Sequence, residues 1–577
     1  MSLNKLLPSL DWLGSYTHTQ FKNDLSAGLT VGIMLIPQGM AYAMIAGLPP
    51  IYGLYASTIP LLIYAFLGTS RHLAVGPVAM VSLLTAAGIG TLAEGGTEVY
   101  IALAITLAFL VGLIQFLLGI FRLGFLVNFL SHPVISGFTS AAALIIGLSQ
   151  LKHLLGINLT GSHHVHEVLW HAIERIGETN WITFGIGVGG ILLLIGLKKW
   201  FRSIPAPLVL VVSSILLVYG LDLPTQDVKI VGAIPSGLPS FSIPDLNWNT
   251  LQSILPVALA ISLVSFMESI AVAKAIQSKH KNYKVVPNQE LKALGLANLF
   301  GSFFQSYPVT GGFSRTAVND QAGAKTGMAS VISAFLIVLT LLYLTPLFYY
   351  LPNAVLASII MVAVFGLIDV QEAKHLWTTN RSDFWMLAVT FFATLALGVE
   401  QGIGIGVVLS LAMIIFQTTR PHIAELGRVP QTHFYRNVDR FEQIEAYEDL
   451  LILRCDAQLY FANSNYFRNI VDEKAAQKGA SLKSILLNFD SINNIDSSAL
   501  HMLKDLIKDY RGHSIDVFFS GIKGPVRDAF QRSNLTQLIG IDHCFMSVQE
   551  AVNHIQGKHN GKEISTKQLR PYLLQTN

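Results

Sequence analysis

The sequence predicts a polytopic α-helical membrane protein that is followed by a small α/β domain. Of its 577 residues, 52% are hydrophobic and only 13% are charged, whereas a soluble globular chain carries roughly 25% charged residues. Apolar runs long enough to cross a bilayer recur from Leu25 to Thr419, and the chain becomes polar after Arg420. The net charge of +3 is too small to indicate a nucleic acid partner.

The first 24 residues are mixed polar and apolar and lack the pattern of a signal peptide, so we expect a short cytoplasmic N-terminus. Both cysteines, Cys455 and Cys544, lie in the polar C-terminal part, which indicates no disulfide framework. We expect neither a cofactor nor a metal. The histidines of a predicted external loop are spaced too loosely for a metal site, and a solvated loop is favoured for them: His163, His164, His166 and His171.

The apolar part contains fourteen expected spans, arranged as two sets of seven. The first set lies near residues 25–46, 50–67, 76–92, 99–121, 124–148, 181–200 and 204–221. The second set lies near residues 251–277, 289–302, 312–325, 327–350, 353–368, 383–399 and 402–419. Two seven-span repeats joined in series have opposite orientations, so residues 25–221 and 251–419 are expected to form an inverted repeat within a transporter domain, 25–420.

The loop charges predict the orientation of these spans. With the N-terminus inside, most loop lysines and arginines fall on the cytoplasmic side, and only Lys152, Arg175 and Lys229 fall on the other. This distribution follows the positive-inside rule. An even number of spans also leaves the C-terminal domain in the cytoplasm.

Two spans are interrupted by glycine and proline, one in each half. The segment 68–77 (GTSRHLAVGP) precedes a short apolar stretch, and the segment 301–312 (GSFFQSYPVTGG) precedes another. A matched pair of interrupted spans is a pointer to a transporter binding site in the middle of the membrane. Two helix N-termini facing each other at that depth would bind an anion without a metal. The alternative is a pair of ordinary kinked spans whose glycines serve packing.

Arg315 is the first candidate binding residue. It lies three residues after Gly312, and a guanidinium at membrane depth usually faces a cavity or a partner. Arginine binds an oxyanion bidentately, and nearby hydroxyl groups would assist: Ser314, Thr310 and Thr316. A structural ion pair or an interfacial arginine is the alternative.

Glu268 is the candidate proton-coupling residue, because it is an acid in the middle of the eighth span. Its protonation would release Arg315 to the substrate, whereas a permanent Glu268–Arg315 pair would only hold the fold. Gln38 and Tyr42 lie one turn apart on the first span and are candidates for the same cavity. A hydrogen bond between helices is the alternative for Gln38.

Strands and helices alternate after the spans and predict an α/β domain at about residues 430–556, with a polar tail at 557–577. Strands are expected at 449–455, 484–489 and 514–520, and helices at 463–478, 497–510 and 524–532.

The chain resembles the SulP family of sulfate permeases and related anion transporters along nearly its whole length. The similar stretches are 37–44 (PQGMAYAM), 49–55 (PPIYGLY), 68–77, 265–274 (SFMESIAVAK) and 311–317 (GGFSRTA), and 495–500 (IDSSAL) resembles a STAS signature. The resemblance implies core and gate domains, elevator-like movement, and a homodimer with cytoplasmic STAS domains. It also implies that the family's carboxylate on the eighth span is Glu268. The binding positions that it implies are Gln38, Tyr42, Val78, Ala79, Ser314 and Arg315.

The STAS resemblance implies one regulatory candidate. In related soluble regulators the serine after the aspartate is phosphorylated, and Ser497 holds that position here. Ala499 stands where those proteins usually have glycine, so a helix N-cap role for Asp496 or Ser497 is favoured over phosphorylation.

These observations predict a secondary active anion transporter of the inner (plasma) membrane and not an enzyme. Proton-coupled sulfate uptake is the favoured activity. Bicarbonate or dicarboxylate transport, with or without sodium coupling, an uncoupled exchanger or channel, and a membrane-anchored STAS signalling scaffold stay open as alternatives.

Overall fold

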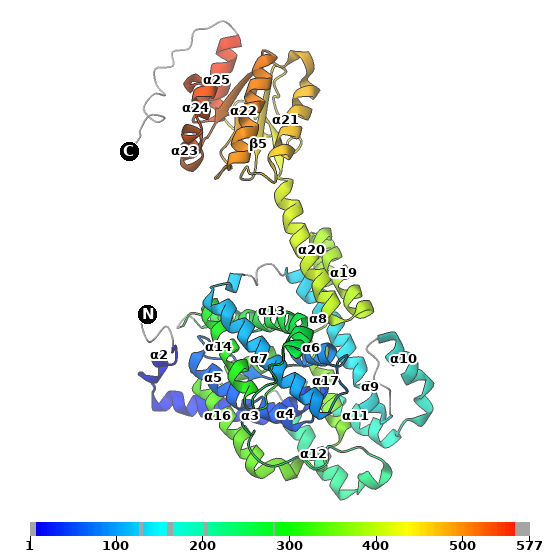
Figure 1. Cartoon of the computed structure of the whole chain (residues 1–577). Helices are drawn as coiled ribbons and strands as arrows, with labels where there is room; N and C mark the ends of the chain where they lie inside the picture. The colour runs from blue at the N-terminus through cyan, green and yellow to red at the C-terminus, as the bar shows by residue number, and fades with distance from the viewer. Residues whose placement is uncertain (1–6, 126–130, 158–164, 201–205, 281–282, 560–577) are drawn as a thin grey trace. The chain divides into compact units, whose positions relative to one another are not determined.

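The computed structural model describes residues 7–125, 131–157, 165–200, 206–280 and 283–559. The chain forms two compact units, Met1–Ser410 and Leu411–Asn577 (Figure 1). The first unit holds most of the apolar sequence, and the second holds a mixed sheet with helices. Each unit is described by itself.

The first unit is built mainly of helices, which run in chain order through two halves, and its last helix, α20 (Val399–Thr419), continues into the second unit. The first half contains α2 (Leu10–Leu13), α3 (His18–Ile45), α4 (Ile51–Tyr55), α5 (Ile59–Leu67), β1 (Val75–Gly76), α6 (Ala79–Ile89), α7 (Glu98–Ile120), α8 (His132–Ser149), α9 (Leu151–Leu155), α10 (Val165–Glu174), α11 (Trp181–Trp200) and α12 (Ala206–Gly220). The second half contains α13 (Trp248–Lys279), α14 (Pro287–Ser302), β2 (Thr310–Gly311), α15 (Phe313–Gln321), α16 (Met328–Leu339), α17 (Asn353–Phe365), α18 (Val370–Thr379), α19 (Arg381–Leu397) and α20 (Val399–Thr419).

The described helices confirm a polytopic membrane protein. Seven of them are long and apolar enough to cross a bilayer, and four shorter apolar helices accompany them. The expected second span is divided into α4 and α5. The helix is interrupted at residues 56–58, and a new helix begins with Pro60 in its first turn. The helices α10 and α18 were not predicted. Both carry a polar face and lie between the expected spans, so no long apolar run indicates them.

The two halves repeat one order of elements around the interrupted spans. A long helix, α3 or α13, is followed by shorter helical segments, then by a two-residue strand and a short helix, α6 or α15. The strands β1 and β2 pair in antiparallel fashion, with Val75 opposite Gly311 and Gly76 opposite Thr310. This pairing places the starts of α6 and α15 side by side, as an inverted repeat requires.

Glycines allow α7 and α14 to approach at backbone distance. A Cβ atom on Gly295 would lie 2.5 Å from Phe116 N, and one on Gly112 would lie 2.4 Å from Leu299 N. Small residues at such crossings permit close helix packing in membranes.

We therefore expect Gly295→Ala to lower the melting temperature of the detergent-solubilised protein, because the added methyl meets backbone atoms and overpacking costs about 1–3 kcal/mol. Fluorescence-detected thermal unfolding measures this effect. Gly189→Ala on α11 is the matched control, since a Cβ there meets nothing within 4 Å. Equal melting temperatures for both variants would contradict the packing argument.

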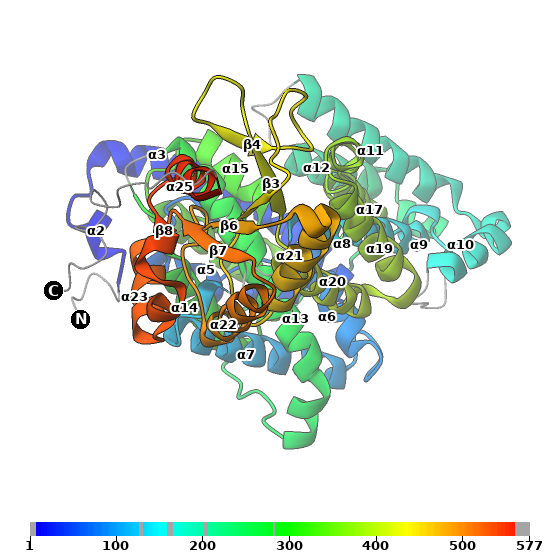
Figure 2. The same ribbon diagram turned by 90° about the horizontal axis from the view of Figure 1, so that it is seen from above.

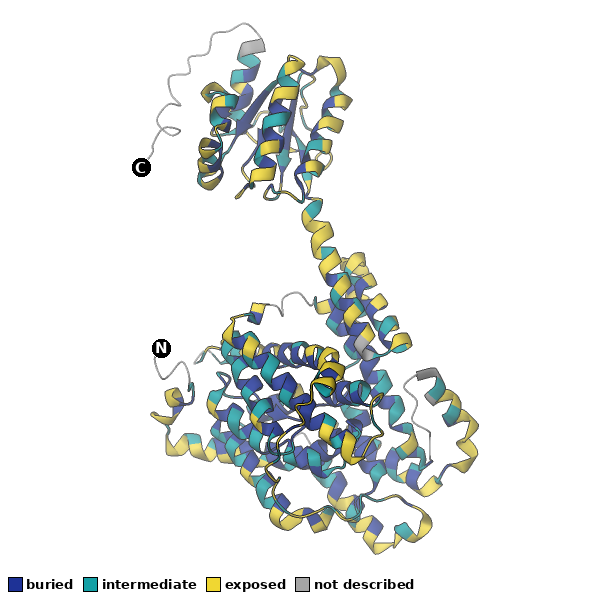
Figure 3. Ribbon diagram, viewed as in Figure 1, coloured by how far each residue is buried: buried dark blue, intermediate teal, exposed yellow. Residues whose placement is uncertain are grey.

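Many residues on the outside of the first unit are exposed (Figure 3), and large apolar residues are among them. Trp181 is 75% exposed, Leu192 65% and Phe392 65%. Apolar exposure of this extent marks a surface that contacts something other than water, and together with the long apolar helices it marks the lipid-facing surface.

The second unit is a six-stranded sheet in the order β4-β3-β5-β6-β7-β8. Its strands are β3 (Ile423–Arg428), β4 (Tyr435–Asn437), β5 (Leu450–Cys455), β6 (Ser484–Asn488), β7 (Asp516–Ser520) and β8 (Cys544–Phe545), with β5 to β8 parallel. Its helices are α21 (Ser464–Lys478), α22 (Ser497–Gly512), α23 (Gly524–Arg532), α24 (Leu535–Ile539) and α25 (Val548–His559).

Helices cover both faces of this sheet (Figure 2). Alternate residues of β5, such as Leu451 and Leu453, pack in a core with α21 to α24, whereas Leu450 and Ile452 pack with α25. The three expected strands are present. The sequence predicts that this domain starts near residue 430, whereas the sheet already includes β3 upstream of that position. A short strand with mixed polarity carries little sequence signal of its own, which is why β3 was not predicted.

Candidate functional site

The two short helices supply unpaired backbone donors to one place. α6 starts after Val78 and α15 starts after Gly312, and neither start has a side-chain cap. The first N–H groups of a helix have no intrahelical acceptor and carry the positive end of the helix dipole. Because β1 and β2 pair immediately before these starts, both sets of N–H groups lie at the same region of the fold.

A cavity of about 1480 Å³ opens at these helix starts. Seven of the residues predicted from the sequence line it: Gln38, Tyr42, Val78, Ala79, Glu268, Ser314 and Arg315. Residues of α8 and α17, such as Phe138 and Ile359, also line it. The cavity is therefore bounded both by the helices with the paired starts and by α8 and α17, and it is large enough for a hydrated small anion.

Arg315 is the buried cation of this cavity. Its side chain is only 1% exposed, and Nη1 donates a hydrogen bond to the carbonyl oxygen of Pro77. Its Nε and Nη2 atoms have no hydrogen-bond partner. Two free donors on one planar guanidinium match the two oxygens of a bidentate oxyanion.

Glu268 lines the same cavity from α13, yet it does not neutralise Arg315 by a hydrogen bond. Its Oε2 atom is buried without a partner, as are Nε and Nη2 of Arg315. The permanent Glu268–Arg315 pair that was the alternative from the sequence is therefore not formed at these atoms. The cavity therefore holds a carboxyl oxygen and two guanidinium nitrogens that are buried without hydrogen-bond partners.

Gln38 and Tyr42 reach the cavity from the middle of α3. Both side chains are buried, and Oε1 of Gln38 has no hydrogen-bond partner. Pro37 lies inside this helix and lacks the N–H that would close the preceding turn. The sequence PQGMAY thus combines a local helix defect with polar side chains at the cavity wall.

Two of the predicted hydroxyl groups are engaged elsewhere. Thr316 is absent from the residues that line the cavity, since its Oγ1 donates to the carbonyl of Gly312 at 2.7 Å and accepts from Ala74 N–H at 3.1 Å. Thr310 donates to the carbonyl of Ser265 at 2.7 Å. These hydroxyl groups hold the segments before α6 and α15 in place, and Ser314 is the hydroxyl that lines the cavity.

A buried amide network behind the site was missed from the sequence. The Oδ1 atom of Asn298 in α14 accepts a hydrogen bond from Val309 N–H at 2.8 Å, and its Nδ2 donates to the carbonyl oxygen of Val309 at 3.1 Å. It also donates to Gln115 of α7 at 3.3 Å, and Gln115 donates to Ser265 Oγ at 2.8 Å. Polar residues within apolar helices were the only available signal, and it does not reveal which residues pair.

The regulatory candidate of the second unit lies at the start of α22. Asp496 is the N-cap, with Oδ1 accepting from Ala499 N–H at 2.9 Å, as favoured from the sequence. Ser497 is exposed in the first turn, and its phosphorylation stays a prediction. Burial raises the pKa of Cys455 to about 11 and that of Cys544 to about 12, so neither thiol is a reactive thiolate. His163 and His164 lie outside the described residues.

Comparison with known proteins identifies the family. The model of the Sulfate permease family matches residues 21–390, and the STAS domain model matches residues 442–551. The chain belongs to the sulfate permease family. Sulfate transporter 4.1, chloroplastic, from Arabidopsis thaliana is 40% identical to this permease over 95% of the chain and 82% of the relative. High affinity sulfate transporter 2 from Stylosanthes hamata is 37% identical over 96% and 86%.

Solved structures share the fold of this permease. SLC26A9 has a TM-score of 0.88 at 28% identity, over 97% of this chain and 94% of that chain. The transmembrane domain of the cyanobacterial bicarbonate transporter BicA has a TM-score of 0.59 at 21% identity, over 68% and 98%, which is a likeness of fold alone. The permease is thus an integral membrane anion transporter with a C-terminal STAS domain.

Proposed function

We propose that this permease takes up sulfate together with protons. The observation that supports the proposal is the pairing of two uncapped helix starts with Arg315, whose Nε and Nη2 are free in the cavity. This arrangement binds an oxyanion by backbone dipoles and a guanidinium and needs no bound metal or sodium ion. The names of the two plant relatives favour sulfate over other oxyanions.

Residue roles follow from chemistry at the cavity. Backbone N–H groups of Val78, Ala79 and Ser314 and the Arg315 side chain bind the anion oxygens. Gln38 and Tyr42 offer further polar contacts from α3. Glu268 carries the coupling proton, because a neutral carboxyl next to a bound anion avoids the repulsion of a carboxylate. Thr316 is proposed as a support of this site rather than a ligand.

The movement is proposed to be elevator-like. The paired helix starts and α13 would travel as one body against the wall of α8 and α17, because β1–β2 pairing and the amide network tie the former together. The permease is further proposed to be a homodimer embedded in the lipid bilayer of the plasma membrane, with both termini in the cytoplasm.

Uptake into proteoliposomes that contain the purified full chain tests the function. Labelled sulfate uptake is expected to increase under an inward proton gradient and to remain unchanged under a sodium gradient. Unlabelled selenate should compete, and bicarbonate and succinate should not. Sodium-driven uptake of bicarbonate without sulfate uptake would contradict the proposal and favour the activity named for the BicA fold relative.

A further inference from the structure

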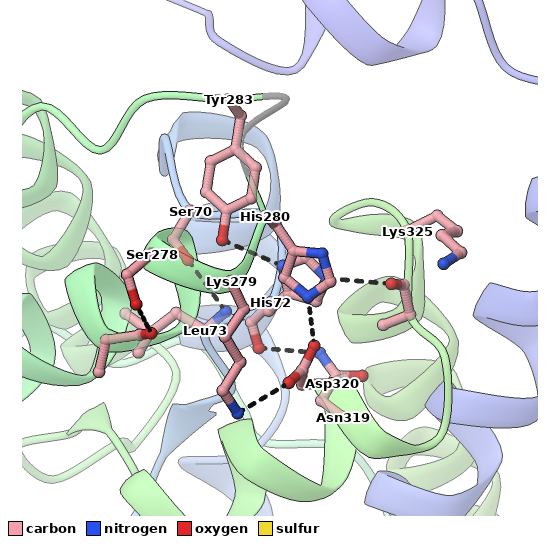
Figure 4. A network of polar contacts seen from close by, with 12 residues as sticks. Ser70, His72, Leu73, Ser278, Lys279, His280, Tyr283, Asn319, Asp320 and Lys325 are labelled. Atoms are coloured by element: carbon pink, nitrogen blue, oxygen red, sulfur yellow. Dashed lines mark hydrogen bonds and ion pairs between the residues drawn. The ribbon is translucent and has the colours of Figure 1, made fainter.

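A polar cluster outside the cavity joins three of the elements that build the site (Figure 4). His72 lies in the segment that leads into β1, His280 directly follows α13, and Asp320 lies in the last turn of α15. His280 Nε2 lies 2.5 Å from Asp320 Oδ1, and Lys279 Nζ lies 3.5 Å from Asp320 Oδ2. The rings of His72 and His280 stack with their centroids 4.5 Å apart.

His72 is bonded on both sides of its ring. Its Nε2 lies 3.0 Å from the carbonyl oxygen of Ala324, and since a carbonyl only accepts, Nε2 carries the hydrogen. Its Nδ1 lies 3.1 Å from the hydroxyl of Tyr283, which donates to the neutral ring. The backbone oxygen of His72 accepts from Asn319 Nδ2 of α15 at 2.9 Å. Burial, followed by the nearby His280, lowers the pKa of His72 to about 4.

The ring geometry disfavours a metal ion here. His72, His280 and Asp320 offer ligand atoms within 4.8 Å of one another. Imidazole lone pairs lie in the ring plane, so two rings that share one ion need planes that meet at that ion. These rings instead face each other with planes 14° apart, and both nitrogens of His72 already have partners. The contacts therefore describe a hydrogen-bonded connection between elements.

This connection lies close to the anion site along α15. Asp320 follows Arg315 by five residues, or about 7.5 Å along a helix axis. At the other end of the connection, α13 carries Glu268, and the segment with His72 continues through β1 to α6. A change at the cluster thus alters how α15 is held against α13 and against the segment that leads to α6.

We propose that these residues form a proton-sensitive latch, the α15 latch, that positions Arg315 in the cavity. The latch consists of His72, His280, Tyr283, Asn319 and Asp320. It fixes the far end of α15 to α13 and to the segment before β1, and protonation of the buried His72 ring loosens it. Its effect on transport rests on the proposed function, whereas its effect on α15 does not.

The charges around the latch explain its sensitivity to acid. Cations face it from three segments, namely Arg71, Lys279 and Lys325, and carboxylates from two, Asp320 and Glu290. A proton on His72 would place a positive charge on a buried ring that stacks on His280 and lies near Lys325, which is destabilising.

The direction of the pH effect follows from His72. Above about pH 6.5 this histidine is neutral in the folded and the unfolded chain alike. Between that value and about pH 4 the unfolded chain binds a proton that the folded site does not. The stability of the latch therefore falls as the pH decreases through this window.

Hydrogen exchange of the full chain in nanodiscs without anion tests the latch directly. Exchange of the hydrogen-bonded Thr316–Gln321 amides of α15, corrected for intrinsic rates, is expected to rise about tenfold in wild type between pH 7.5 and pH 5.5. In Asp320→Asn it is expected to be raised to a similar extent at both pH values. His72→Gln keeps a donor and an acceptor but cannot bind the proton, so its exchange should stay low at both. His501→Gln, at an exposed histidine 3.9 Å from Asp505 in the second unit, is the matched control.

Wild-type exchange rates in Asp320→Asn would overturn the latch. So would a rise in melting temperature on adding Zn²⁺ to wild type but not to His280→Gln, because that result would assign a metal site. Titration with sulfate adds the functional readout: Asp320→Asn should weaken binding about tenfold at pH 7.5, and His72→Gln should remove the extra loss below pH 6.5. If wild type binds no sulfate, the proposed function fails, and the exchange data still decide the latch.

Discussion

Arg315→Ala is expected to abolish sulfate binding by the purified permease. The guanidinium is 1% exposed, it lines the cavity next to the two helix starts, and its Nε and Nη2 have no hydrogen-bond partner. Removing one partner of a buried charge-assisted contact costs about 2–5 kcal/mol, so affinity should fall at least about 30-fold. Isothermal titration with sulfate in detergent measures the loss.

Two further variants separate charge from geometry at this position. Arg315→Lys keeps a point charge without the planar fork and should recover only part of the affinity. Lys274→Ala, at a second cation that lines the cavity from α13, is the control and should keep binding within a few-fold. Unchanged affinity in a folded Arg315→Ala protein would remove Arg315 from the site.

Glu268→Gln is expected to uncouple uptake from the proton gradient while preserving anion binding. The amide mimics the neutral carboxyl in shape and cannot release a proton, so the variant stays in the form that accepts the anion. Sulfate exchange across proteoliposomes should continue, and the stimulation by an inward proton gradient should disappear. With one proton coupled, a gradient of one pH unit drives sulfate accumulation about tenfold, and this factor should be lost.

The control for this variant is a buried carboxylate outside the cavity. Glu290 is fully buried and accepts from Tyr64, Thr69 and Ser70, so Glu290→Gln should reduce thermal stability and leave the gradient dependence intact. Gradient-driven uptake at the wild-type level in Glu268→Gln would exclude a coupling role for Glu268.

Much of the site was predictable because its signals are local. Glycine and proline break an apolar run at a definite residue, and a lone arginine or glutamate in such a run is costly wherever the chain folds. The starts of α6 and α15, and the presence of Arg315 and Glu268 in the cavity, required no knowledge of neighbours. The strands β5, β6 and β7 were predictable for the same reason, since each is a short buried apolar run.

The sequence by itself determined the class of protein, the two interrupted spans and the charged residues placed within the apolar part. Only the tertiary structure decided which polar groups form hydrogen bonds with one another. Thr316 binds Ala74, Asn298 binds Val309 and Gln115, and His72 meets Tyr283 and Ala324 across more than 200 residues of chain. A hydroxyl, amide or imidazole has the same local sequence signal whether it faces a cavity or a neighbouring helix. Its partner depends on helix packing, which periodicity and composition do not encode.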